Sequence, residues 1–183
     1  AVAHPFNVSF GLMVTLLTII LGALYLLNNI DHKPLDAQIR LGLKQLFVGF
    51  LVMLVIVLAQ LFTMDGFGVD ENGVVSMVAY KYLHNLLAMP MVLVMFLIGA
   101  VLLVIGVLRT IIVKGYKRGI WFSGPGTVLV VMSIFFLAGY NGTSYYPSTT
   151  DLQSSLTLAN SSSSEFTLTA MSIVSLVIPF VVA

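Results

Sequence analysis

Five long apolar stretches set the strongest limit on how this chain of 183 residues can fold. They cover residues 6–27, 46–63, 86–108, 120–140 and 166–183. At about 1.5 Å of rise per residue, helices of these lengths measure about 27 to 35 Å, which matches the hydrocarbon core of a bilayer, about 30 Å thick. We therefore expect an all-α, polytopic bundle of transmembrane helices, with residues 1–183 forming a single transmembrane domain.

The composition excludes a water-soluble fold. Charged residues make up 8% of the chain and hydrophobic residues 59%, whereas an ordinary soluble domain is about 25% charged. A soluble protein with five buried helices in succession would have almost nothing left to face water. The formal charge of +1 is too small for a surface that follows nucleic-acid phosphates, so we expect no nucleic-acid partner. The chain has no cysteine, which excludes disulfides and thiolate metal sites.

The charges between the apolar stretches predict an orientation. The first and third loops, with their helix edges, hold seven basic residues: Lys33, Arg40, Lys44, Arg109, Lys114, Lys117 and Arg118. The second loop holds only Lys81, and residues 141–165 of the fourth hold neither Lys nor Arg. Because Lys and Arg are retained on the cytoplasmic side, we expect loops 29–45 and 109–119 to be cytoplasmic and residue 1 to lie outside.

The middle of each apolar stretch is free of Asp, Glu, Lys, Arg and His. Proton relays and ion or substrate sites in membranes normally need such groups at depth. The sequence therefore predicts helices that act as a scaffold, with no catalytic, cofactor-binding or metal-binding residue in this chain. Gln60, Asn7 and scattered Ser and Thr residues are the deepest polar groups, and we expect hydrogen bonds between helices to account for them.

The three histidines, His4, His32 and His84, lie in loops or at helix edges. Ligation of haem or metal by the pair His4 and His84 is an alternative, but interfacial hydrogen bonding is the favoured interpretation. Five acidic residues could offer oxygen ligands to a divalent cation: Asp31, Asp36, Asp65, Asp70 and Glu71. Their spacing fits no calcium loop, so we expect them to be solvated turn residues instead.

Several local patterns predict details of the fold. The turn-forming residues 65–68 and 70–73 indicate that the second loop folds back on itself before residues 80–87 begin the third helix. Ser162 and Glu165 have capping-box spacing for the last helix. Two features concern helix geometry and packing: residues 124–126 (GPG) should kink or loosen the fourth helix, and three glycines could permit close helix contacts, namely Gly22, Gly99 and Gly106.

Four segments resemble subunit II of the cytochrome bd-type quinol oxidases, over almost the whole chain and in the second half of that subunit. They are GALYLLNNIDHKPLDAQIR (residues 22–40), the stretch from DGFGVD to YKYLHNLLAMP (65–90), KRGIWFSGPGTVL (117–129) and AGYNGTSYYPSTTDLQSSLTLANSSSSEFTLT (138–169). The polar segment from Tyr145 to Phe166 is the most specific, because loop sequence is less constrained by membrane composition than the helices are.

The resemblance implies a terminal respiratory oxidase of the bacterial cytoplasmic (inner) membrane that oxidises quinol and reduces dioxygen to water. It implies that haems b and d belong to a partner, subunit I, that this chain binds none, and that quinol is the substrate of the complex. Membrane lipid, quinone and a small third subunit are further expected partners.

The family's subunit II has nine spans, so the resemblance also implies that this chain is a fragment that lacks four spans before residue 1, and we expect both ends to be truncated. No catalytic residue is carried over. The alternatives are a secondary transporter or another membrane scaffold fragment, which would need broken helices and midplane polar groups, and a haem-binding cytochrome b subunit, which would need histidines within the spans.

Overall fold

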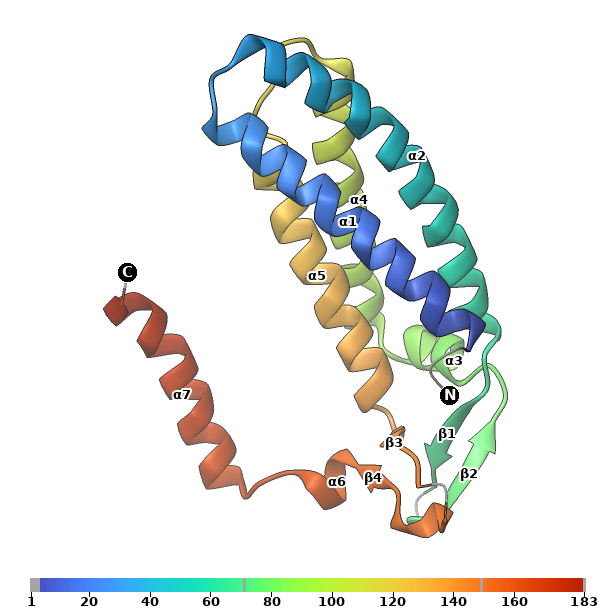
Figure 1. Cartoon of the computed structure of the whole chain (residues 1–183). Coiled ribbons are helices and arrows are strands. Elements are labelled where there is room, and N and C mark those ends of the chain that lie inside the picture. The colour runs from blue at the N-terminus through green and yellow to red at the C-terminus, as the bar shows by residue number, and fades with distance from the viewer. Residues whose placement is uncertain (1–3, 71, 149, 183) are drawn as a thin grey trace.

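The computed structural model describes residues 4–70, 72–148 and 150–182. Four helices of this part of the chain are long and apolar enough to cross a membrane. They are α1 (Pro5–Asn29), α2 (Lys33–Thr63), α4 (Pro90–Ile112) and α5 (Ile120–Gly139). Figure 1 shows them side by side as one elongated bundle. The expectation of an all-α membrane bundle is confirmed by these four helices.

Shorter elements gather at one end of this bundle. They are β1 (Gly66–Val69), β2 (Val75–Val78), α3 (Lys81–Ala88), β3 (Ser144–Tyr146), η1 (Leu152–Ser154), β4 (Leu156–Thr157) and α6 (Leu158–Ser161). The last helix, α7 (Glu165–Val182), follows them. In Figure 1, α7 stands apart from the bundle, at the end of the connection that runs through β4 and α6.

The second loop folds back as an antiparallel hairpin, as its turn-forming residues predict. β1 and β2 pair from Gly66 opposite Val78 to Val69 opposite Val75. The Asp70 carboxylate accepts hydrogen bonds from the amides of Asn72 (3.0 Å) and Val74 (2.7 Å), which closes the turn.

Proline lies in the first turn of three of the four long helices: Pro5 in α1, Pro34 in α2 and Pro90 in α4. This position suits proline because its missing N–H would have no intrahelical partner in the first turn. At Pro90 a second property of proline, the bulk of its ring, separates two helices. Proline disfavours helical geometry at the preceding residue, and Met89 has φ −117° and ψ 79° between α3 and α4.

The predicted third stretch, residues 86–108, is therefore displaced. Its first residues belong to α3, and the membrane helix α4 begins at Pro90 and continues to Ile112. Arg109 does not end this helix, because a cation is favourable in the last turn, where carbonyls lack partners. Similarly, α2 begins at Lys33 and not at residue 46, since residues 33–45 form a charged helical extension beyond the apolar part.

The last predicted stretch, residues 166–183, coincides with α7 except for Ala183, which lies outside the described residues. The capping residue was wrongly predicted. Helix α7 starts at Glu165 and Ser164 is its cap: the Ser164 hydroxyl oxygen lies 3.4 Å from the Thr167 amide that donates to it. Because Ser164 directly precedes the first helical residue, its hydroxyl reaches a free amide of the first turn.

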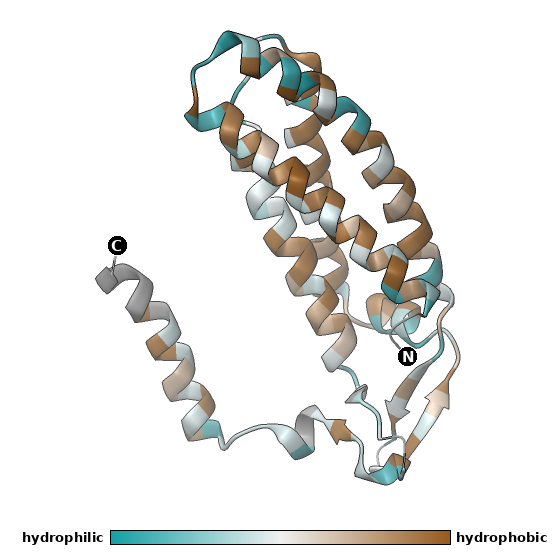
Figure 2. Ribbon diagram, viewed as in Figure 1, coloured by the Kyte–Doolittle hydropathy of each residue, from teal (hydrophilic) through white to brown (hydrophobic). Residues whose placement is uncertain are grey.

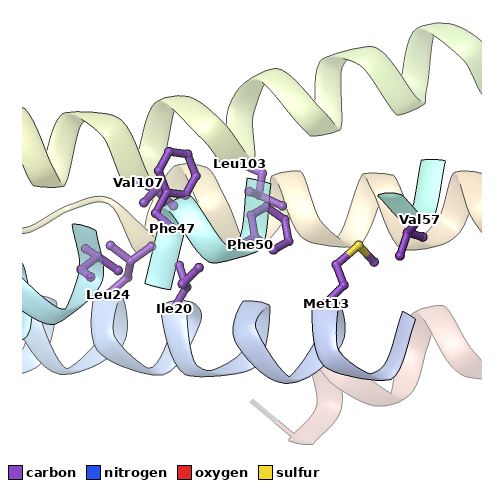
Figure 3. Close-up of a cluster of buried hydrophobic side chains, with 9 residues drawn as sticks. Met13, Ile20, Leu24, Phe47, Phe50, Val57, Leu103 and Val107 are labelled. Atoms are coloured by element: carbon purple, nitrogen blue, oxygen red, sulfur yellow. The ribbon is translucent and has the colours of Figure 1, made fainter. Parts of the chain in front are cut away.

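The buried core lies between α1, α2 and α4. Its cluster comprises Met13, Ile20, Leu24, Leu43, Phe47, Phe50, Val57, Leu103 and Val107, and Figure 3 shows most of these side chains meeting between the helices. Figure 2 shows hydrophobic residues along the long helices and hydrophilic residues concentrated towards the ends of the bundle. Such a distribution suits helices surrounded by lipid, where association depends on packing and hydrogen bonds more than on burial from water.

Candidate functional site

The two basic loops meet at one end of the bundle, as their charges predict. We call this the basic end, residues 30–44 and 109–118, and we call the opposite end, residues 65–85 and 139–157, the hairpin end. At the basic end, the Lys117 ammonium lies 2.9 Å from the Asp31 carboxylate and 3.0 Å from the Asp36 carboxylate. Both acidic groups of the first loop are thus paired with one cation of the third loop.

These ion pairs shift the pKa values of Lys117 and Asp31 in opposite directions. The hydrogen bond with Asp31, and then that with Asp36, raises the pKa of Lys117 above its ordinary value of 10.5. In turn, the hydrogen bond and charge of Lys117 lower the pKa of Asp31 below its ordinary value of 3.8. Asp31 is exposed and Lys117 is half-buried, so water and salt reach the pair and screen the attraction. The pairs connect the two loops, and among the described residues no other Lys or Arg of the basic end forms an ion pair.

Arg40 makes a second connection between the same loops. Its guanidinium donates to the carbonyl of Thr110 and, at 2.6 Å, to the carbonyl of Tyr116. Thr110 lies in the last turn of α4, whose carbonyls have no intrahelical partner, so the charged donor satisfies the helix end and favours its dipole. The guanidinium of Arg109 covers the Tyr116 ring, 5.1 Å from its centroid.

At the hairpin end, Lys81 connects the β-hairpin to the loop after α5. Its ammonium donates to the Asn141 carbonyl at 2.9 Å. Its side chain crosses Gly66 and Gly68, where an added Cβ on Gly66 would approach the Lys81 Cβ to 2.9 Å. Partial burial lowers the pKa of Lys81, because the charged form loses water.

Asn85 is the most constrained polar side chain at this end. It is fully buried, and its amide donates to the Leu137 carbonyl (2.9 Å) and the Thr143 hydroxyl (2.7 Å). Its amide oxygen accepts from Asn141 at 3.1 Å. Together these bonds attach α3 to the end of α5 and the loop that follows.

Sequence reasoning missed the role of Asn85. The available signal is its position directly before the apolar pair Leu86 and Leu87 in YKYLHNLL (residues 80–87).

The loop after α5 also pairs with the hairpin. Gly68 and Thr143 form an isolated antiparallel bridge, and the Val69 amide donates to the Gly142 carbonyl at 2.7 Å. Asn141 and Gly142 both have positive φ, at 57° and 58°, so the chain turns sharply before the bridge. The result is that backbone pairing joins the loop after α5 to the β1–β2 hairpin.

Glycines bring α4 and α5 into backbone contact. A Cβ on Gly126 would lie 2.6 Å from the Leu103 amide nitrogen, and one on Gly99 would lie 2.8 Å from the Gly126 carbonyl. A Cβ on Gly106 would likewise lie within 3.0 Å of atoms of Gly119 and Ser123. The expected close approach is confirmed for Gly99 and Gly106 but is wrong for Gly22, which has no heavy atom within 4 Å of such a Cβ. The GPG segment, residues 124–126, does not interrupt α5, and its second glycine serves helix packing.

The candidate ligands are dispersed. The His4 and His32 imidazoles accept hydrogen bonds from backbone amides at the starts of α1 and α2, each at 3.3 Å, and His84 is exposed on α3. Asp65 accepts from the Tyr80 amide at 3.4 Å, and Asp70 closes the β-turn. Glu71 lies outside the described residues. Within the described residues, no three His, Asp or Glu side chains are grouped to hold a metal.

Gln60 forms a hydrogen bond between helices, as expected from its position in an apolar stretch. The Ser9 hydroxyl of α1 donates to the Gln60 side-chain oxygen of α2 at 2.7 Å, which confirms the expected contact between helices for Gln60. Both ends of the bundle are thus joined by polar contacts between loops, and its interior is held by packing and by hydrogen bonds between helices.

The family model for cytochrome bd terminal oxidase subunit II matches residues 1–183. The chain belongs to this family. A comparison with curated proteins gives no significant match. Membership confirms the resemblance carried by the loop segments, and it identifies the chain as a membrane component of a haem-containing quinol oxidase of aerobic respiration.

Proposed function

We propose that this chain is the non-haem subunit II of a cytochrome bd-type quinol oxidase and pairs with a haem-carrying subunit I. The observation that carries the proposal is the family match over residues 1–183. In this role the complex oxidises quinol and reduces dioxygen to water, haems b and d reside in the partner, and this chain supplies a helical scaffold.

The positions of the titratable residues support a scaffold role. Seven of the eight Lys and Arg residues lie at the basic end, and Lys81 lies at the hairpin end. The histidines that could ligate haem instead cap helices or face outward. Proton transfer and haem ligation at depth both need titratable or ligating side chains between the two ends.

The exposed apolar surface supports an assembly role. Met91, Trp121 and Phe135 are 84%, 69% and 71% exposed on α4 and α5, although lipid as well as a partner subunit can cover such a surface. We propose that part of this surface contacts subunit I, that α7 forms a fifth span, and that these five belong to a nine-span subunit in the bacterial cytoplasmic membrane. A small third subunit, lipid and quinone are further proposed partners.

The test uses the full-length subunit, tagged and purified with its partners from its own membranes. A reduced-minus-oxidised visible spectrum and quinol-dependent oxygen uptake are recorded for the unchanged complex and for the triple variant His4→Ala, His32→Ala, His84→Ala. We expect co-purified b- and d-type bands, oxygen uptake and an unchanged haem content in the triple variant. Loss of one haem from a fully assembled variant complex would show that this chain holds haem, and a colourless, inactive intact preparation would refute the oxidase assignment.

A further inference from the structure

A hollow lies between the two helical hairpins of the bundle, α1–α2 and α4–α5. Its volume is 120 Å³, and all four helices line it. Aromatic side chains come from three of them, namely Phe10, Phe50 and Phe96, while Ala100 and Val130 are smaller residues on the α4–α5 side. Figure 3 shows Met13, Phe50 and Leu103, which also line it, in the space between α1, α2 and α4.

Helix packing explains why space remains there. α4 and α5 touch at the backbone through Gly99 and Gly126, which draws these two helices together. The seam between the hairpins is filled by side chains alone, and the small Ala100 side chain leaves part of it empty.

The wall of the hollow offers nothing for water to bind. Thr127 is the one polar side chain among the described residues that line it, and its hydroxyl donates to the Ser123 carbonyl of its own helix at 2.7 Å. A buried water needs two to four polar partners, and apolar cavities of about 150 Å³ remain dry and bind xenon or benzene.

We propose that this hollow is a binding site for a small apolar gas, and that in a respiring membrane this gas is dioxygen. Dioxygen is uncharged and apolar, so transfer from water into an apolar enclosure is favourable for it. Val14 and Val131, at the edge of the hollow, are 41% and 40% exposed. That edge therefore opens through apolar side chains towards the hydrocarbon of the bilayer, from which the gas enters without crossing a polar surface.

The volume favours a gas over a lipid. A cavity of 120 Å³ is within the range that accommodates xenon or one benzene, whereas an acyl or isoprenoid chain needs an extended groove for many methylene groups. The hollow is a site within this chain that the proposed function does not assign, and the choice of dioxygen as its gas rests on that proposed function.

The experiment is xenon pressurisation of crystals of the intact oxidase with full-length subunits, followed by an anomalous difference map. We expect a xenon peak between α1, α2, α4 and α5 in the unchanged protein. The variant Ala100→Leu fills the hollow and should lose the peak. The matched control Val101→Leu, at the next residue of α4, whose side chain is 55% exposed, should keep it.

Val130→Phe fills the hollow from α5 and provides a second variant, with haem content reporting assembly of each complex. An empty hollow under xenon in the unchanged protein would overturn the proposal, as would ordered water or elongated hydrocarbon density there. Retention of the peak in a correctly assembled Ala100→Leu or Val130→Phe complex would also overturn it. Xenon density reports the hollow, whereas co-purified haem reports the oxidase assignment, so failure of one can be distinguished from failure of the other.

Discussion

At the residue scale, Asn85 shows how one buried amide can organise a helix end. All of its described hydrogen bonds lead to α5 or the loop that follows α5. In a low-dielectric interior, removal of one partner leaves the others without hydrogen bonds, which costs more than the bond itself contributed.

We therefore expect Asn85→Ala to destabilise the folded subunit by about 1–3 kcal/mol. The measurement is thermal unfolding of the assembled complex in a fixed detergent, with loss of helical circular dichroism as the signal. His84→Ala is the matched control, because His84 is exposed on the same short helix. Equal stability of the two variants would contradict the network assigned to Asn85.

The two connecting lysines should titrate in a definite order. Burial lowers the pKa of Lys81 below 10.5, whereas the hydrogen bonds with Asp31 and Asp36 raise that of Lys117 above it. We expect NMR of ¹³C-methylated lysines to show Lys81 losing its proton at lower pH than Lys117. Asp36→Asn should reduce the pKa of Lys117 and leave Lys81 unchanged, and Asp70→Asn serves as the control. The reverse order would contradict these environments.

The same shifts give the pH range of the connection at the basic end. The pKa of Lys117 is raised in the folded state, so its contribution is fully present below pH 10.5 and is lost as pH rises through the raised value. The pKa of Asp31 is lowered, so its contribution is present above pH 3.8 and is lost as pH falls through the lowered value. The ion pairs therefore act across the whole physiological range.

At the element scale, the contact between α4 and α5 depends on glycines at particular turns. Gly126 faces the backbone of α4, while Gly124, two residues earlier on α5, has no heavy atom within 4 Å of an added Cβ. The two glycines of one GPG segment therefore have different structural roles, and an experiment can separate them.

We expect Gly126→Ala to destabilise the subunit by about 1–3 kcal/mol, because the new methyl group forces the helices apart. Gly124→Ala should be neutral or slightly stabilising, since alanine is the better helix former. Unfolding of both variants under the same conditions checks the contrast. If both variants are tolerated equally, α4 and α5 do not approach as closely as the structure places them.

At the scale of the whole molecule, the charge distribution predicts the orientation in the membrane. Lys114 lies at the basic end and Ser154 in the loop at the hairpin end, with α5 between them in sequence. Ser175 lies within α7, the proposed fifth span. The positive-inside rule places Lys114 in the cytoplasm and Ser154 outside.

Single cysteines introduced by Lys114→Cys, Ser154→Cys and Ser175→Cys into a cysteine-free full-length subunit test this arrangement. With a membrane-impermeant thiol reagent, we expect labelling of position 114 from the cytoplasmic face only and of position 154 from the outer face only. Position 175 should resist labelling from both faces. Labelling of positions 114 and 154 from the same face would contradict the crossing of α5, and ready labelling of position 175 would contradict a fifth span.

Parts of the fold follow from sequence alone because they depend on local or one-dimensional properties. Apolar stretches of bilayer length determine that the chain forms membrane helices, since backbone groups in lipid must bond internally. Turn residues 70–73 determine the hairpin, because their backbone preferences are local. The alternation of basic and non-basic loops determines which loops share an end of the bundle. The family could be identified because polar loops carry sequence that membrane composition does not dictate.

Other features were decided only by the tertiary structure. The boundary at Pro90 was misplaced because hydropathy is continuous across residues 86–108, while proline geometry divides that stretch. The roles of Arg40 and Asn85 depend on carbonyls 70 and 52 residues away in sequence, and the difference between Gly22 and Gly126 depends on which helix lies opposite. The gas-sized hollow has no sequence signature at all. It exists because four helices, each well formed by itself, meet with side chains that do not fill the space between them.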